Sequence, residues 1–265
     1  MDNTVSDTPI SPGLMKLALA VERSVLPLVY AFFAWQRIDI MQTRYHSFHK
    51  LSVLSMPSPT SQPGLQNIAY AAMTKDLLLA LLMVFAGVAL LFSRTPTVLP
   101  SKLKHVLVPL AMSYYFLLYG MVDRLPAWLR ENLLPSSCQV PVALAGLILS
   151  LIGYAVSIWA LLHLGRSFSI LVSVRKIVSS GPYAHVRHPI YLGYAIDLCG
   201  LLLASCSIAM FILGAGFATF LIVRARIEEE MLCEADEGYR SYVNRTGFLL
   251  PRCFKHSHEP ILGKE

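Results

Sequence analysis

Residues 180–193 read SGPYAHVRHPIYLG and lie between two long apolar segments. The Gly-Pro pair at 181–182 is a turn signal, and Pro189 suits the first position of a helix, where its missing N–H would be unpaired anyway. Arg187 and His188 would then stand just ahead of the helix, beside its free N–H groups and positive dipole end. Such a place attracts an anion, for instance a ligand carboxylate. We therefore expect a ligand site at the start of this helix.

A second polar cluster follows the next apolar stretch. It begins at Arg224 and Arg226, continues through the three glutamates of 228–230, and is followed by Tyr239 and Tyr242. Two charged clusters that bracket an apolar hairpin are typical of a site at a membrane surface. We interpret the two tyrosines as interfacial or packing residues, since aromatic side chains are enriched at that level of a membrane.

The composition is that of a membrane protein. The chain has 265 residues, of which 55% are hydrophobic and only 14% charged, and its mean hydropathy is +0.56. Soluble domains carry about 25% charged residues. We therefore predict an all-α, polytopic integral membrane protein that has the lipid bilayer as its partner. The net charge of +6 fits Lys- and Arg-rich cytoplasmic loops, and because no nucleic-acid-binding motif is present we expect no nucleic-acid partner.

The hydropathy pattern predicts five to six membrane-spanning helices, each needing about 20 mostly apolar residues. The predicted spans are 14–35, 77–92, 106–122, 140–164, and a tight hairpin of 190–203 and 207–223. The first is the least certain span, since it contains Lys16, Glu22 and Arg23, and Pro27 would kink it. We expect a polar loop at 38–67, a connector at 125–135 with a short helix around Trp128, a basic loop at 166–187 and a polar tail after Arg224.

The distribution of basic residues predicts how the chain is oriented. With six spans, both termini and the second and fourth connections lie on one side of the membrane, and most of the Lys and Arg residues lie there too. The positive-inside rule then places both polar clusters at the cytoplasmic face. If the first segment does not span, only the N-terminus changes side.

A site at this face could take a soluble cofactor from the cytoplasm and a lipophilic substrate from the bilayer. Arg187 and His188 suit the carboxylate of a zwitterionic cofactor, while Glu228 and Glu229 suit its ammonium group or ribose hydroxyls. Two rings of the first stretch could stack on a base or approach a sulfonium; they belong to Tyr183 and Tyr191. Methyl transfer needs mainly in-line alignment, so positioning can supply much of the rate. No metal-ligand spacing is present, and we expect no metal.

These two clusters resemble the signature of a known family. GPY at 181–183 followed by RHPIYLG at 187–193 is similar to the first motif of the isoprenylcysteine carboxyl methyltransferase family. The family's second motif, a Glu-Glu pair before a Leu and then a Gly and a Tyr-x-x-Tyr, is matched by EEEML at 228–232 and GYRSY at 238–242. GRSFS at 165–169 also looks like bacterial members. The resemblance covers about residues 140 to 252.

The resemblance implies S-adenosylmethionine as the cofactor and assigns residues to it. The cofactor-binding residues that it implies are Ile177, Val178, Tyr183, His188, Pro189, Ile190, Tyr191, Glu228 and Glu229. It implies that Arg224 faces the substrate carboxylate and that Arg187 has a catalytic or electrostatic role. A carboxylate nucleophile needs no general base, which agrees with the lack of an obvious one. The corresponding domain division is an unassigned N-terminal transmembrane region (1–137), a catalytic region (138–254) and a C-terminal tail (255–265).

The methyl acceptor stays open at this point. The Tyr-x-x-Tyr block is reached through CEADE at 233–237, without the family's usual aromatic residue, and the N-terminal half matches no recognisable pattern. The acceptor is therefore the carboxylate of a prenylated cysteine, a phospholipid amine or a small thiol. Two rival hypotheses are an NADPH-dependent membrane reductase, in which a His-Pro-x-Tyr block also occurs but normally with Asn at the position of Ile190, and a non-enzymatic accessory protein.

Overall fold

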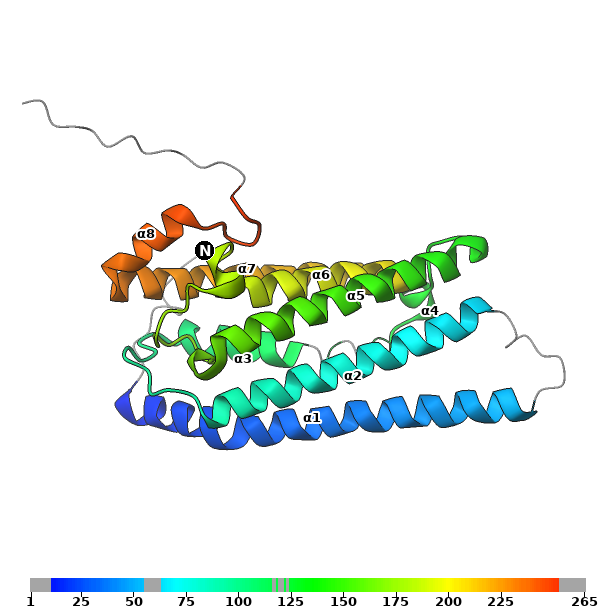
Figure 1. The fold of residues 1–265 in the computed structure, drawn as a ribbon, viewed down its shortest axis with the longest axis horizontal. Coiled ribbons are helices and arrows are strands. Elements are labelled where there is room, and N and C mark those ends of the chain that lie inside the picture. The colour runs from blue at the N-terminus through cyan, green and yellow to red at the C-terminus, as the bar shows by residue number, and fades with distance from the viewer. Residues whose placement is uncertain (1–10, 55–62, 116–117, 119–121, 123, 253–265) are drawn as a thin grey trace, which may run out of the picture.

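The computed structural model describes residues 11–54, 63–115, 118, 122 and 124–252. Long helices lie side by side with their axes roughly aligned, and the short helix α8 covers one end of the bundle (Figure 1). The helices are α1 (Pro12–Leu54), α2 (Pro63–Leu91), α3 (Lys104–Tyr114), α4 (Ala127–Arg130), α5 (Ser136–Leu164), α6 (Pro189–Ser205), α7 (Ile208–Ala235) and α8 (Glu237–Arg245). Two 3-10 turns, η3 (Gly165–Ser167) and η4 (Gly181–Ala184), interrupt the long loop before α6. The all-α prediction is confirmed.

Four helices are long and apolar enough to cross a membrane, and they span 12–47, 70–91, 136–167 and 208–235. Helix α6 is apolar but shorter. Large apolar side chains on their outer faces, such as Leu28, Phe32, Ile148 and Ile212, are exposed. In a bilayer these faces contact lipid tails, so the chain is a multi-pass integral membrane protein.

The predicted polar loop at 38–67 is largely wrong. Helix α1 continues to Leu54 and α2 begins at Pro63. No Gly or Pro occurs between Ile38 and Leu54 to end the first helix, and Pro63 occupies a helix start, where proline is tolerated. Pro27 lies inside α1 without ending it.

The remaining predicted elements agree with the structure except in one place. The spans at 77–92 and 140–164, the short helix around Trp128 and the hairpin of α6 and α7 are all present. In the predicted span at 106–122, the described helix α3 ends at Tyr114 after 11 residues, about 16 Å, too short to cross a bilayer alone. The rest of that segment lies partly outside the described residues, as do the last residues of the C-terminal tail.

Helices α5 and α6 form the most extensive helix pair, because glycines face each other along it. A Cβ on Gly153 would lie 2.6 Å from the carbonyl oxygen of Gly193, too close for any side chain. The same close approach occurs at a second pair of glycines, where a Cβ on Gly146 would lie 2.5 Å from the carbonyl oxygen of Gly200. Small residues are common at helix–helix interfaces in membranes, because they let the two backbones approach closely. Here they hold the start of α6 against α5.

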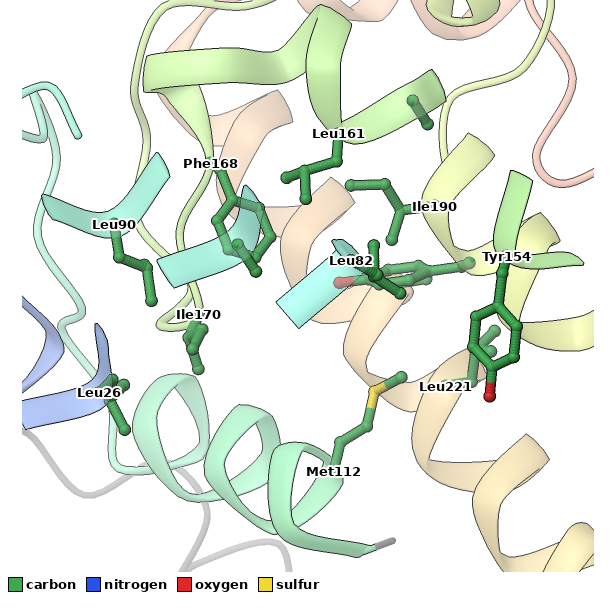
Figure 2. Close-up of a cluster of buried hydrophobic side chains, with 14 of the residues drawn as sticks. Leu26, Leu82, Leu90, Met112, Tyr154, Leu161, Phe168, Ile170, Ile190 and Leu221 are labelled. Carbon is green, nitrogen blue, oxygen red and sulfur yellow. The ribbon is translucent and has the colours of Figure 1, made fainter. Parts of the chain in front are cut away.

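The buried core lies between the helices and the long loop of 165–188. Figure 2 shows side chains from α1, α2, α3, α5, α6 and α7 around two loop residues, Phe168 and Ile170. Ile170 is 1% exposed, although it lies on a loop. The loop is therefore packed into the bundle, and it closes the end where both sequence clusters are found.

Candidate active site

The first sequence motif forms the turn and helix start that it predicts. Gly181 begins η4 with φ +60°, and a Cβ there would collide with the His163 ring. His188 is the N-cap of α6 and Pro189 its first residue. Tyr183 is buried, its carbonyl accepts a hydrogen bond of 2.6 Å from the Tyr242 hydroxyl, and burial raises the pKa of its own hydroxyl well above the usual value.

Glu228 is the point where the two motifs meet. Its Oε1 accepts a hydrogen bond of 2.5 Å from the Tyr191 hydroxyl and one of 3.0 Å from Nε of Arg224. Its Oε2 lies 3.9 Å from Nδ1 of His188. The side chain remains 23% exposed, so this carboxylate is fixed by the protein while one side of it stays open to a ligand.

Three of these groups are layered. The His188 ring stacks on the Tyr191 ring with centroids 5.3 Å apart and planes 8° from parallel. The Arg224 guanidinium lies 5.5 Å from the centroid of the same tyrosine ring, within the range of a cation–π contact. Phe248 contacts the other side of the histidine edge-on at 5.1 Å. The histidine is thereby held in one orientation.

Glu229 is held by two residues of the first motif. Nε2 of His188 lies 3.2 Å from its Oε1, and Nε of Arg187 donates to the same oxygen. Arg187 also donates from Nη1 to the carbonyls of Val243 at 3.0 Å and Thr246 at 2.5 Å. The guanidinium therefore ties α7 to the end of α8, which is the geometry of a positioning residue.

Arg224 is buried, with 7% of its surface exposed. Its Nη2 donates to the carbonyl of Ile170 at 2.9 Å and more weakly to that of Ser169 at 3.5 Å, while Nε is engaged by Glu228. Nη1 has no hydrogen bond to any residue that the structure describes. Arg224 also lines the cavity described below, so this nitrogen is available to a ligand.

Sequence reasoning missed the residue that holds the loop in place. Glu22 is fully buried and pairs with Arg175 at 3.0 Å. Its Oε1 accepts from the Ser169 hydroxyl at 2.6 Å and from the backbone N–H groups of Ile170 and Leu171 at 2.7 and 3.0 Å. The signal was present, because an acidic residue inside an apolar segment needs a partner. The partner's place in space could not be read from the chain.

One cavity of about 1000 Å³ joins most of the predicted site, a size at the upper end of ligand pockets. Nine of the eleven predicted site residues line it: Ile177, Val178, Tyr183, Arg187, His188, Ile190, Tyr191, Arg224 and Glu228. Pro189 and Glu229 are not among the lining residues; Pro189 is the first residue of α6, and Glu229 contacts the histidine. Tyr239 and Tyr242, which we interpreted as packing residues, also line the cavity.

Residues 146–234 match the model of the isoprenylcysteine carboxyl methyltransferase (ICMT) family. The match covers about a third of the chain. It runs from α5 through the first motif to Glu234, near the end of α7, and thus contains all eleven predicted site residues. The chain is accordingly a multi-pass membrane protein with a region similar to that family.

The chain is similar to the structure of the eukaryotic intramembrane Ras methyltransferase ICMT, with 14% identity and a TM-score of 0.39, covering 91% of this chain and 98% of that one. Comparison with curated proteins gives no significant match.

Proposed function

We propose that this protein is an S-adenosylmethionine-dependent membrane methyltransferase that acts on a lipophilic or small acceptor. The observation that carries the proposal is the position of Glu228. Its carboxylate is fixed by Tyr191 from α6 and Arg224 from α7, lines the large cavity, and lies in the segment that matches the ICMT family.

The residues around the cavity suit such a cofactor. S-adenosylmethionine carries an ammonium, a carboxylate, ribose hydroxyls and a sulfonium, and when bound it supplies an electrophilic methyl group. The half-open carboxylate of Glu228 suits the ammonium group or the ribose hydroxyls, and a buried ring such as Tyr183 suits a base or a cation. Ile177 and Val178 add an apolar wall from the loop.

Arg224 is proposed to orient the acceptor. Its Nε and Nη2 are already engaged by Glu228 and Ile170, so the remaining nitrogen can bind an acceptor carboxylate with its oxygen directed at the methyl group. An ionised carboxylate is already nucleophilic, so its methylation needs no general base. This suits the site, because the carboxylates of Glu228 and Glu229 already accept hydrogen bonds from the protein. Holding both reactants in line is a large part of what such catalysis requires.

The orientation of the protein is part of the proposal. The loop of 165–188, the start of α6, the end of α7 and α8 all lie at one end of the bundle (Figure 1). By the positive-inside rule this end faces the cytoplasm, where S-adenosylmethionine is available. The catalytic region is the proposed 138–254 unit, and helices α1, α2 and α3 add further residues to the cavity wall.

Calorimetric titration of the detergent-purified protein with S-adenosylhomocysteine, with NADPH in parallel, tests the proposal. We expect S-adenosylhomocysteine to bind and NADPH not to bind. Binding of NADPH alone would replace methyl transfer with a reductase activity. Binding of neither, in protein shown to be folded, would favour a non-enzymatic role. A positive result would be followed by an acceptor screen with prenylated cysteines, lipid amines and small thiols.

A further inference from the structure

The segment that follows α2 brings three arginines together. The carbonyl of Phe92 accepts a hydrogen bond of 2.9 Å from Nε of Arg166, which lies in η3. The carbonyl of Ser93 accepts a longer one of 3.5 Å from Nη2 of Arg23, which lies in α1. The backbone N–H of Arg94 donates to the carbonyl of Arg166 at 2.8 Å. Arg23, Arg94 and Arg166 are thus attached to three consecutive residues, and together they form the arginine cluster.

The positive charge of the arginine cluster is not neutralised within the part of the chain that the structure describes. There, none of its three members forms an ion pair with a carboxylate. Glu22 is next to Arg23 in sequence, but it is fully buried and pairs with Arg175. The two segments that meet at the cluster, 92–103 and 165–188, contain no acidic residue. A ligand that brings a negative charge would therefore meet no competing carboxylate on either segment.

Arg23 uses few of its hydrogen-bond donors. The 3.5 Å contact is the one hydrogen bond that its side chain makes to the described residues, and its Nε is buried without a partner. The hydroxyl of Ser93, the residue that it contacts, is also buried and without a partner. A guanidinium offers several N–H donors and no acceptor, and phosphate is a group that engages two such donors at once. An incompletely bonded guanidinium in an apolar helix therefore favours an anionic ligand.

The surroundings of the cluster suit a lipid headgroup better than a soluble anion. Arg94 and Arg166 are exposed, and they lie at the end of the apolar helix α2. Directly before Arg94, the side chains of Leu91 and Phe92 are also exposed. The last turns of α5, just before Arg166, expose Trp159, and tryptophan is enriched at the membrane–water interface. Basic groups beside exposed apolar side chains can meet the phosphate and the acyl chains of one lipid together.

We propose that the arginine cluster binds the phosphate of an anionic phospholipid whose acyl chains lie against Leu91 and Phe92. The start of α1 and the end of α2 lie at the end of the bundle that carries the loop of 165–188 (Figure 1). A lipid held by the cluster ties the beginning of this loop to both helices. The same loop supplies Ile177 and Val178 to the cavity wall, so the lipid supports the candidate active site from outside. The inference does not depend on methyl transfer.

The test titrates the full-length protein, purified in an uncharged detergent, with three probes in a calorimeter. The probes are dioctanoylphosphatidylglycerol, dioctanoylphosphatidylcholine and inorganic phosphate. We expect the phosphatidylglycerol to bind and inorganic phosphate not to bind. The phosphatidylcholine should bind at least about fivefold more weakly than the phosphatidylglycerol, which is the effect expected of one basic side chain near an anionic lipid surface.

Substitutions in the cluster locate the binding. Arg23→Gln, Arg94→Gln and Arg166→Gln should each weaken phosphatidylglycerol binding about fivefold, because each removes one basic group from the headgroup. The matched control is Arg240→Gln, which removes an exposed arginine from α8 at the same end of the bundle and should leave the affinity unchanged. The Arg94 side chain makes no hydrogen bond to the described residues, so its variant decides the question if either of the others fails to fold.

Three results would overturn the inference. Equal affinity for the two phospholipids would show that the headgroup charge is not recognised. A loss in the Arg240 variant as large as that in the cluster variants, or no loss in any of them, would show that binding is not located at the cluster. Inorganic phosphate that bound as tightly as the phosphatidylglycerol would make the cluster a site for a soluble anion and not for a lipid.

Discussion

Tyr191 donates a hydrogen bond of 2.5 Å to Glu228, linking the first turn of α6 to the C-terminal half of α7. Arg224 binds the same oxygen from the preceding turn of α7. The tyrosine ring is at the same time covered by His188 on one side and approached by the Arg224 guanidinium. This single contact therefore connects the two sequence motifs, and it determines where the open side of the carboxylate points.

Replacing Glu228 by Ala should weaken binding of S-adenosylhomocysteine by about tenfold or more, because a hydrogen bond to a charged group contributes about 1.5–3 kcal/mol. Calorimetric titration measures the effect. The matched control is Glu230→Ala, two residues further on, where the carboxylate is 47% exposed and pairs with Lys104. Exposed pairs of this kind contribute little. Equal affinities in the two variants would remove Glu228 from the cofactor site.

Replacing Arg224 by Ala should spare cofactor binding and reduce turnover, since Tyr191 still holds Glu228 while the nitrogen that faces the acceptor is lost. Turnover is measured as methyl ester formation on an S-alkylated N-acetylcysteine, and cofactor affinity by calorimetry. Arg226→Ala is the control, because Arg226 is exposed on the same helix. Turnover that matched the control would make Arg224 an anchor of the loop through Ile170 and nothing more.

The sequence predicted which residues lie around one cavity better than it predicted where the helices end. Local motifs with fixed spacing, such as the proline at the start of α6 and the glutamates of α7, placed nine residues around one cavity. The loop assignment after Ile38 failed because polar residues without Gly or Pro can continue a helix, and α1 does so as far as Leu54. Polarity alone cannot distinguish a loop from the end of a long helix.

Contacts between distant segments could not be read from the chain. Glu22 and Arg175 are far apart in sequence, and nothing in either segment specifies the other as its partner. Each of these residues was visible as a charge in or near an apolar segment, which indicates that a partner is needed but not which one.

Replacing Glu22 by Ala should lower thermal stability strongly. The change leaves Arg175 buried without its counter-ion and removes the acceptor of the Ile170 and Leu171 N–H groups. Breaking a buried pair from one side typically costs about 3–5 kcal/mol. Thermal unfolding in detergent measures the effect, with Asp39→Ala as the control, because Asp39 is an exposed acid on the same helix. A melting temperature equal to that of the control would show that the loop is held by its apolar packing alone.

Replacing Arg187 by Lys should loosen α8 more than it weakens cofactor binding. Lysine keeps the positive charge but cannot reproduce the planar fork that reaches Glu229 and the carbonyls of Val243 and Thr246 at the same time. Hydrogen exchange of residues 237–245 should therefore become faster, while the affinity for S-adenosylhomocysteine changes less than in the Glu228 variant. If turnover were lost while exchange in α8 stayed as slow as in the unmodified protein, Arg187 would act on the substrates directly, and the positioning role derived from its three acceptors would be wrong.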